Sequence, residues 1–253
     1  MSEKSYQDVN VETISRWIED GWEWGRPISH EEYLRAKTGD WQILLTPTKP
    51  VPRTWFPPLA GARVLGLASG GGQQMPILTA AGARCTVLDY TPAQLDAERL
   101  VAGREGYGIE VVHADMTQAL PFSDASFDLV VSPVSFCYVR EVKPIWHEVA
   151  RVMAPGATLL SGLDLGINYI VDDDERLIVR GLPFDPVADP SLAAMLARED
   201  SGMQFSHSLD DLLGGMLHAG LQIRDLFEDT NGEGRLHELG VPSMIAVRAE
   251  KPR

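Results

Sequence analysis

The sequence predicts an α/β protein built around a parallel sheet. From residue 62 onward, short apolar runs alternate with segments of helical periodicity, which is typical of strand-helix-strand units. A glycine-rich turn, Gly70 to Gly72, follows the first apolar run, and Asp89 ends the second. A chain of 253 residues, of which 44% are hydrophobic, is long enough to bury such a core without disulfides or metal ions.

Seven apolar runs are expected to form the strands. In chain order they are residues 62–67, 84–89, 109–115, 127–132, 157–163, 221–228 and 243–249. Helices are expected among them at residues 73–81, 92–103, 142–153 and 208–220. Thr91 is a suitable N-cap for the second of these helices, because Pro92 then takes the first helical position, where its missing N–H is not needed.

The chain before this sheet is predicted to contain two helices and a proline-rich strap. Apolar residues from Val9 to Ile18 have helical spacing. Residues 30–37 form a second expected helix, with Ser29 and Glu32 as a capping box. Five prolines between Pro47 and Pro58 disfavour both a helix and a central strand, so we predict an extended strap there.

These elements divide the chain into an N-terminal segment, residues 1–60, and a main domain, residues 61–253. Within the main domain, residues 166–207 lose periodicity and are expected to be an insertion after the fifth strand. The insertion thus begins at the carboxyl end of a strand, which is where parallel sheets bind ligands. It is therefore predicted to be a lid over a ligand pocket, with a surface loop as the alternative. Its acidic run, Asp172 to Glu175, favours a solvated turn over a metal site, because consecutive carboxylates point in different directions. The cysteines and histidines show no zinc spacing, so no metal is expected.

The composition carries an acidic excess. Asp and Glu number 36 against 22 Lys and Arg, for a formal net charge of −14. Such a field repels phosphate backbones and anionic lipids, so neither nucleic acid nor a membrane is expected as a partner. No apolar stretch approaches the roughly 20 residues of a bilayer span. With no secretory signal and two widely spaced cysteines, Cys85 and Cys137, the chain is expected to be cytoplasmic.

The glycine-rich turn indicates a ligand site. Gly70, Gly71 and Gly72 lack side chains, so a ligand can approach the backbone and the free N–H groups at the start of the next helix. Asp89 ends the following strand, where its carboxylate can accept hydrogen bonds from the two hydroxyls of a ribose. Either feature alone also has a packing interpretation, but together they favour a cofactor that contains a nucleoside.

Two cofactor classes use this geometry: dinucleotides and S-adenosylmethionine. The dinucleotide fingerprint G-x-G-x-x-G requires a glycine at position 75 if it starts at Gly70, and Met75 is found there. The one Tyr-x-x-x-Lys pair, Tyr33 and Lys37, precedes the glycine turn instead of following the fifth strand. An NAD(P)-dependent oxidoreductase is therefore the weaker alternative.

Four segments within residues 62–163 form an ordered set of motifs: VLGLASGGGQQ, TVLDYTPAQLDAER, HADMTQALPFSDASFDLVVS and IWHEVARVMAPGATLLSG. In order and spacing this set resembles the class I S-adenosylmethionine-dependent methyltransferases, in their small-molecule branch. The resemblance implies a Rossmann-like, seven-stranded, mostly parallel sheet with helices on both faces and an antiparallel last strand. It also implies S-adenosyl-L-methionine as the cofactor and a small molecule as the methyl acceptor.

The resemblance further implies a cofactor site at the carboxyl edge of the sheet. Carried over position by position, it comprises Ala68, Ser69, Gly70 and Gly72 at the methionine and ribose end, Asp89 at the ribose hydroxyls, Tyr90 and Met116 against the adenine, Asp115 at the adenine amino group, and Pro133 to Ser135 facing the sulfonium.

One departure from the family pattern lies in the first strand. Gly66 stands where the family usually has an acidic residue, and Ala68 stands where it usually has glycine. Because that acid typically organises the loop, its absence keeps a second alternative open, a cofactor-binding module without transferase activity. Ser69 or a residue of the N-terminal segment is the expected substitute.

The acceptor pocket is less defined by the sequence. Methyl transfer is a displacement at an activated carbon, so it needs alignment and exclusion of water more than a nucleophile or a metal, and no catalytic residue is assigned. Candidate pocket residues are Cys137, Tyr138, Tyr169 and His207, each of which also has an ordinary packing interpretation. Trp41 is a candidate cover, because four of the six tryptophans lie within the first 41 residues. The polar connection at residues 228–239 is expected to be a solvated hairpin.

Overall fold

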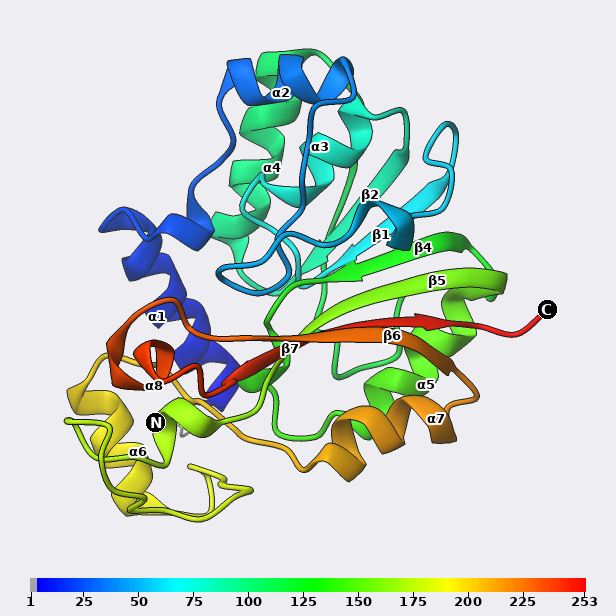
Figure 1. Ribbon diagram of the computed structural model, residues 1–253. Helices are drawn as coiled ribbons and strands as arrows, with labels where there is room; N and C mark the ends of the chain where they lie inside the picture. The colour runs from blue at the N-terminus through cyan, green and yellow to red at the C-terminus, as the bar shows by residue number, and fades with distance from the viewer. Residues whose placement is uncertain (1–3) are drawn as a thin grey trace.

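The computed structural model describes residues 4–253 and centres on a seven-stranded sheet (Figure 1). Its strands are β1 (Arg63–Leu67), β2 (Arg84–Asp89), β3 (Glu110–His113), β4 (Phe127–Ser132), β5 (Met153–Asp164), β6 (Gln222–Asp229) and β7 (Met244–Glu250). The order across the sheet is β3-β2-β1-β4-β5-β7-β6. Strands β1 to β5 pair in parallel, and β7 is antiparallel to both of its neighbours. The predicted mostly parallel sheet with an antiparallel last strand is confirmed.

Helices cover both faces of this sheet. The α-helices among the described residues are α1 (Tyr6–Glu19), α2 (His30–Lys37), α3 (Gln74–Ala80), α4 (Pro92–Glu105), α5 (Lys143–Val152), α6 (Pro190–Arg198), α7 (Gly215–His218) and α8 (Gly234–Glu238). Figure 1 shows α2, α3 and α4 on one side of the sheet, and α5 and α7 on the other. Between residues 4 and 253, no helix has the length and apolar character needed to cross a bilayer.

The central strands β1 and β4 are buried on both faces. The side chains of Val64, Leu65 and Leu67 are completely buried, as are those of Leu129 to Val131. One apolar cluster includes residues of α5 and α7, and a second includes residues of α3 and the strap. A parallel strand covered on both faces has no polar side, which is why these strands appear in the sequence as continuous apolar runs.

The two helix starts with clear capping signals behave differently. At α2 the Ser29 hydroxyl accepts a hydrogen bond from the Glu32 N–H at 3.1 Å, and the Glu32 carboxylate accepts one from the Ser29 N–H at 2.7 Å, so the capping box is confirmed. Thr91 takes the N-cap position of α4 with Pro92 after it, but its side chain makes no capping hydrogen bond. The Thr91 N–H donates to Asp89 at 2.8 Å instead, which ties the start of α4 to the predicted ligand site.

The proline-rich strap lies against the carboxyl edge of the sheet. The buried carboxylate of Asp229, at the end of β6, accepts a hydrogen bond from the Thr48 N–H at 2.9 Å. Just before the strap, the Leu45 carbonyl accepts from the Val134 N–H, after β4, at 3.1 Å. The beginning of the strap is thereby held at the carboxyl edge of the sheet, by a contact near the central strand β4 and another at the outer strand β6.

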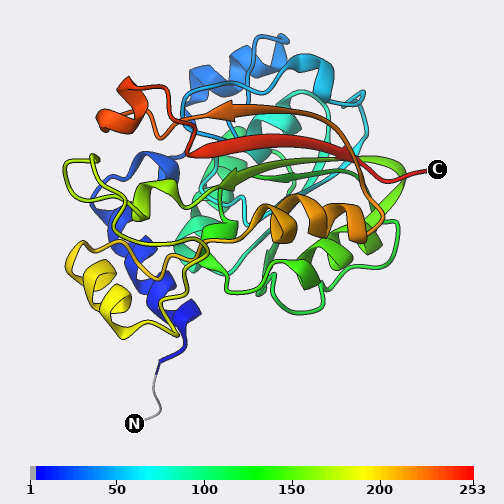
Figure 2. The ribbon, with the colours of Figure 1, turned by 60° about the horizontal axis from the view of Figure 1, so that its bottom comes forward.

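The segment between β5 and β6 folds into a small unit beside α1. It contains α6 and a separate apolar cluster of Ile170, Phe184, Leu192 and Leu196. Figures 1 and 2 both show α6 next to α1. Helix α6 was not expected from the sequence, because prolines stand close together in this segment. Pro190 occupies the first helical turn, and the Asp189 side chain caps the helix by accepting from the Ser191 N–H at 2.9 Å.

Two C-terminal expectations need correction. The helix expected over residues 208–220 begins with a π-helical turn, Asp210–Gly214, and only Gly215–His218 is α-helical. The connection at residues 228–239 is not a simple hairpin, because it contains α8.

Gly162 in β5 allows the chain before the strap to approach the sheet. A Cβ at this position would lie 2.1 Å from the Leu45 carbonyl oxygen, so one of the two backbones would have to move. We expect Gly162→Ala to lower the free energy of unfolding by about 1–3 kcal/mol, the usual cost of overpacking, as measured by urea unfolding.

Gly103→Ala is the matched control, because Gly103 lies in α4 and the added Cβ would meet no packing neighbour within 4 Å, apart from its adjoining helix backbone, among residues 4–253. We expect this variant to be more stable by up to about 1 kcal/mol, since alanine favours a helix. Equal effects of the two substitutions would contradict the close packing of Leu45 on β5.

Candidate functional site

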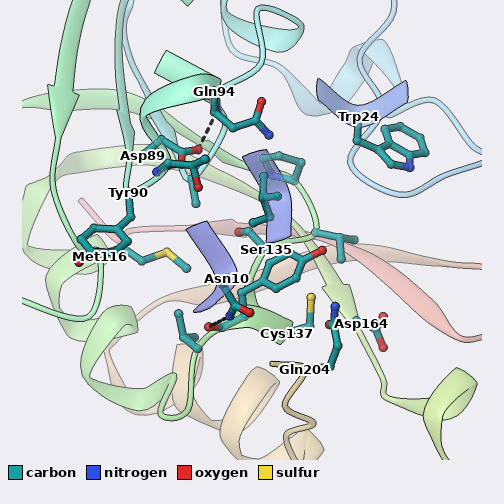
Figure 3. Close-up of a pocket in the computed structure, with 18 of the residues that line it drawn as sticks. Asn10, Trp24, Asp89, Tyr90, Gln94, Met116, Ser135, Cys137, Asp164 and Gln204 are labelled. Carbon is teal, nitrogen blue, oxygen red and sulfur yellow. Dashed lines mark hydrogen bonds between the residues drawn. The ribbon is translucent and has the colours of Figure 1, made fainter. Parts of the chain in front are cut away.

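A cavity of about 380 Å³ opens at the carboxyl ends of β1, β2, β4 and β5 (Figure 3). Its wall combines the loops after these strands with α1 and the first residues of the strap. The direction in which successive strands are added reverses here. From β1 the chain adds β2 and β3 on one side, and it then returns to add β4 on the other side of β1. Open parallel sheets bind their ligands at such a switch point.

Asp89 closes β2 and connects it to the glycine turn after β1. Its carboxylate accepts hydrogen bonds from the Gly70 N–H at 3.1 Å and the Thr91 N–H at 2.8 Å. Burial raises the pKa of Asp89, although these N–H groups oppose the rise. Because two backbone groups orient the carboxylate at the cavity wall, its remaining lone pairs are available to a ligand.

A second carboxylate, Asp115, lines the cavity after β3. One of its oxygens accepts from the backbone N–H and the hydroxyl of Thr117, both at 2.8 Å. The other lies 3.4 Å from Nε2 of Gln7 in α1. Nearby, the ring of Tyr90 stacks on that of His113 with centroids 5.7 Å apart. A carboxylate oxygen of Asp115 can accept a hydrogen bond from a heteroaromatic base, and the flat ring of Tyr90 can pack against the face of such a base.

The departure at Gly66 has a packing explanation. A Cβ at Gly66 would lie 2.8 Å from the sulfur of Met75, which is completely buried in α3. Met75 therefore fills the space that a side chain at position 66 would need. The glycine turn is held instead by Gln74, whose side chain accepts from the Ser69 hydroxyl at 3.2 Å and donates to the Leu44 carbonyl at 3.3 Å.

Most of the site residues expected from the sequence line this cavity. They are Ala68, Gly70, Asp89, Tyr90, Asp115, Met116, Pro133, Ser135, Cys137, Tyr138 and Tyr169. These residues follow β1, β2, β3, β4 and β5, so the common edge of the parallel strands brings them together.

Two residues expected at the cofactor do not line the cavity. Ser69 is 1% exposed, and its hydroxyl faces Gln74 within the loop. The Gly72 N–H donates to Glu98 of α4 at 2.8 Å, and its carbonyl accepts from the Ile28 N–H at 2.9 Å. Both residues shape the turn from behind, because their polar groups are already paired within the protein.

Two residues expected at the acceptor also lie elsewhere. The ring of Trp41 packs against the guanidinium of Arg53, 3.1 Å from its centroid, in a separate depression. His207 places Nε2 at 3.0 Å from the Phe136 carbonyl oxygen, and burial lowers the pKa of the imidazole. The tryptophans that do line the cavity are Trp17, Trp22 and Trp24.

Helix α1 covers the cavity, and we call α1 together with residues 200–204 the roof. Asn10 of α1 is only 5% exposed, donates to the carbonyls of Tyr138 and Met203 at 3.3 and 3.2 Å, and accepts from the Met203 N–H at 2.6 Å. Further along α1, about one and a half turns after Asn10, Arg16 forms an ion pair with Asp200. Asn10 was not among the residues expected at the site. Its position within an apolar helical stripe was the available signal, because a buried polar group needs a hydrogen-bond partner.

The end of the cavity opposite Asp89 contains Cys137, Tyr138, Tyr169 and Asp164. Burial raises the pKa of Cys137 well above its usual value and also raises the pKa of both tyrosines. Burial raises the pKa of Asp164 to about 6, although the Gly166 N–H opposes the rise. At neutral pH the thiol and the phenols are therefore uncharged, and Asp164 is the group here that is ionised.

The charged side chains of the cavity wall are all acidic among the described residues. Its charged members are Asp89, Asp115 and Asp164, and no lysine, arginine or histidine lines it within residues 4–253. In the same part of the chain, no group of three or more His, Cys, Asp or Glu side chains is arranged to hold a metal ion.

Comparisons with known proteins agree with this geometry. A family model described as a methyltransferase domain matches residues 65–161. An uncharacterized methyltransferase of Bacillus subtilis, YbaJ, is 36% identical over 230 residues, which are 88% of this chain and 90% of that protein. A demethylmenaquinone methyltransferase of Clavibacter sepedonicus is 38% identical over 104 residues, 41% of either chain. The crystal structure of an S-adenosylmethionine dependent methyltransferase from Mesorhizobium loti aligns with a TM-score of 0.62 at 21% identity, over 79% of this chain and 95% of that one.

The chain therefore belongs to the class I S-adenosylmethionine-dependent methyltransferases. It is a methyltransferase, and its cofactor is S-adenosyl-L-methionine. This membership sets aside both the oxidoreductase and the module without transferase activity.

Glu98 is a buried carboxyl group directly behind the glycine turn. It is 0% exposed, and Oε1 accepts from the Gly72 N–H at 2.8 Å. The other oxygen, Oε2, is buried without a partner among residues 4–253. Burial, reinforced by the nearby charge of Asp89, raises the pKa of Glu98 from 4.5 to about 8.

This pKa makes stability depend on pH. Between about 4.5 and 8 the folded state holds a proton on Glu98 that the unfolded state has released, so the free energy of unfolding falls as pH rises through this window. Glu98→Gln keeps an acceptor for the Gly72 N–H and does not titrate. We expect its stability relative to wild type to increase by roughly 2–4 kcal/mol between pH 5 and pH 9, as measured by urea unfolding.

Glu19→Gln, at an exposed position of α1, is the control and is expected to show a much smaller change over this range. A stability difference for Glu98→Gln that stays constant with pH would mean that Glu98 ionises normally in the folded protein.

Proposed function

We propose that this methyltransferase acts on a small-molecule acceptor that binds in the cavity beside S-adenosylmethionine. The observation that carries the proposal is the roof. Asn10 and Arg16 attach α1 to residues 200–203, so the cavity is covered on the side that faces away from the sheet. A macromolecular acceptor would need an open groove at this edge, whereas a small molecule fits under the roof.

The charges of the cavity support the same class of acceptor. The wall contains three aspartates and no basic side chain among the described residues, and the whole chain has a formal net charge of −14. Phosphate groups and other anions are repelled by such a wall. We therefore expect an acceptor that is uncharged or positively charged.

Some relatives support a small acceptor in a general way. The Clavibacter protein is named for demethylmenaquinone, and it matches this chain over 41% of its own length. The YbaJ relative, which matches over 90% of its length, is uncharacterized. The acceptor must therefore be inferred from the cavity of this chain.

The opposite end of the cavity fits the cofactor. Asp89 would accept hydrogen bonds from the ribose hydroxyls, and Asp115 would accept one from the adenine amino group. Oε1 of Gln94, in the same wall, is buried and has no partner among residues 4–253, as expected of an atom whose partner is a ligand. When bound, the cofactor supplies a methyl carbon activated by a positively charged sulfur. The protein's own contribution is to align this carbon with the acceptor and to exclude water.

Asp89→Ala tests the cofactor site. We expect this variant to bind S-adenosylhomocysteine more weakly by roughly 1.5–3 kcal/mol, because charge-assisted hydrogen bonds to the ribose are lost. Isothermal titration calorimetry of the folded variant measures the change directly.

The matched control is Asp96→Ala, which removes an exposed carboxylate of α4 that pairs with Arg99 at 2.7 Å. Its affinity for S-adenosylhomocysteine should equal that of the wild type. A folded Asp89→Ala variant with unchanged affinity would show that the ribose binds elsewhere.

A further inference from the structure

Asp164 stands at the end of the cavity remote from Asp89. It is the last residue of β5, and Figure 3 shows its carboxylate beside Cys137 and Gln204, with Asp89 at the opposite side of the view. Within residues 4–253 its side chain accepts one hydrogen bond, from the Gly166 N–H at 2.5 Å. A carboxylate can accept several more, and this one lines the cavity.

Asn168 adds a second acceptor at the same end. It lies in the turn Ile167–Tyr169 that follows β5, and it lines the cavity with Asp164. Its Oδ1 is buried and has no hydrogen-bond partner among the described residues. A buried carbonyl oxygen without a partner is costly, so a ligand that donates a hydrogen bond would relieve this cost.

The titratable groups that face Asp164 are uncharged, so Asp164 carries the charge at this end of the cavity among the described residues. Cys137 and Tyr138 face it from the turn after β4, and Tyr169 faces it from the turn after β5. All three stay protonated because they are buried. No basic side chain lines the cavity within residues 4–253, so the protein supplies no counterion to this carboxylate. A buried charge without a partner is unfavourable until a donor reaches it.

We propose that Asp164 and Asn168 form the acceptor subsite, and that they select molecules carrying an N–H or O–H group. This inference rests on the proposed function, because it places the acceptor in the cavity beside the cofactor. The donor group would bond to the carboxylate of Asp164 and the Oδ1 of Asn168, with the rings of Tyr138 and Tyr169 as apolar walls. An ether or an N,N-dialkylaniline of the same shape, which stays unprotonated near neutral pH, offers no hydrogen and would leave both oxygens without this donor.

The test uses the full chain loaded with S-adenosylhomocysteine and four small aromatic probes. Phenol and aniline carry the donor, whereas anisole and N,N-dimethylaniline are their methyl-capped counterparts. All four are uncharged at about pH 8. Affinities are measured by ligand-observed NMR titration. We expect phenol, aniline or both to bind at least about tenfold more tightly than the capped counterpart, and the stronger of the two identifies hydroxyl or amine as the preferred group.

Variants locate this preference. Asp164→Asn and Asn168→Ala are each expected to lower the affinity for the preferred probe by about tenfold. The affinity for S-adenosylhomocysteine should change less than about twofold. Asp173→Asn, at an exposed position of the insertion, is the control and should match the wild type. The affinity of the preferred probe for the wild type should also fall when the pH drops below about 6, as Asp164 takes up a proton, and this dependence should be absent in Asp164→Asn.

Several results would overturn the subsite. They are equal binding of free and capped probes, unchanged binding in both variants, or no binding of any probe to the loaded wild type. Failure of the wild type to bind S-adenosylhomocysteine would be a different result, which counts against the proposed function itself.

Discussion

The site depends on one buried carboxylate that accepts hydrogen bonds from two backbone loops. Asp89 ends β2 and bonds to the N–H groups of Gly70, after β1, and Thr91, before α4. Neighbouring parallel strands end at the same edge, so their loops leave N–H groups that need partners. Asp89 pairs two of them and remains at the cavity wall. A single residue thus organises the glycine turn, the start of α4 and the expected ribose position, which couples the local fold to cofactor binding.

The other half of the site is built by contacts between segments distant in the sequence. Asn10 joins α1 to Tyr138 and Met203, and the strap is held by Asp229. These contacts cover the cavity of a fold that many enzymes share, and the cover determines which acceptors can enter. Because fold alone does not define the substrate, the polar groups under the roof carry the information about the acceptor. Among residues 4–253 those groups include carboxylate and amide oxygens, a thiol and phenols, and no basic side chain.

The pair formed by Gly66 and Met75 shows how a family pattern can change while the fold persists. Each residue taken alone weakens a sequence motif, one for methyltransferases and the other for dinucleotide enzymes. In the structure the sulfur of Met75 occupies the volume next to the Gly66 backbone, so a larger residue at position 66 would require the Met75 side chain to move. Interiors are densely packed, and a small residue is tolerated where a neighbour fills the space. The loop then relies on Gln74 for its polar contacts.

The sequence by itself determined the sheet and most of its helices, and it predicted most of the residues that line the cavity around Asp89. Buried parallel strands read as apolar runs, and residues such as Asp89 and Asp115 follow them directly, so local patterns are sufficient there. Only the tertiary structure decided that Trp41 and His207 lie outside the cavity and that Asn10, Asp164 and Asn168 line it. Their positions result from the docking of α1 and of the segment after β5. Such docking depends on packing between residues far apart in the chain, and no local periodicity records it.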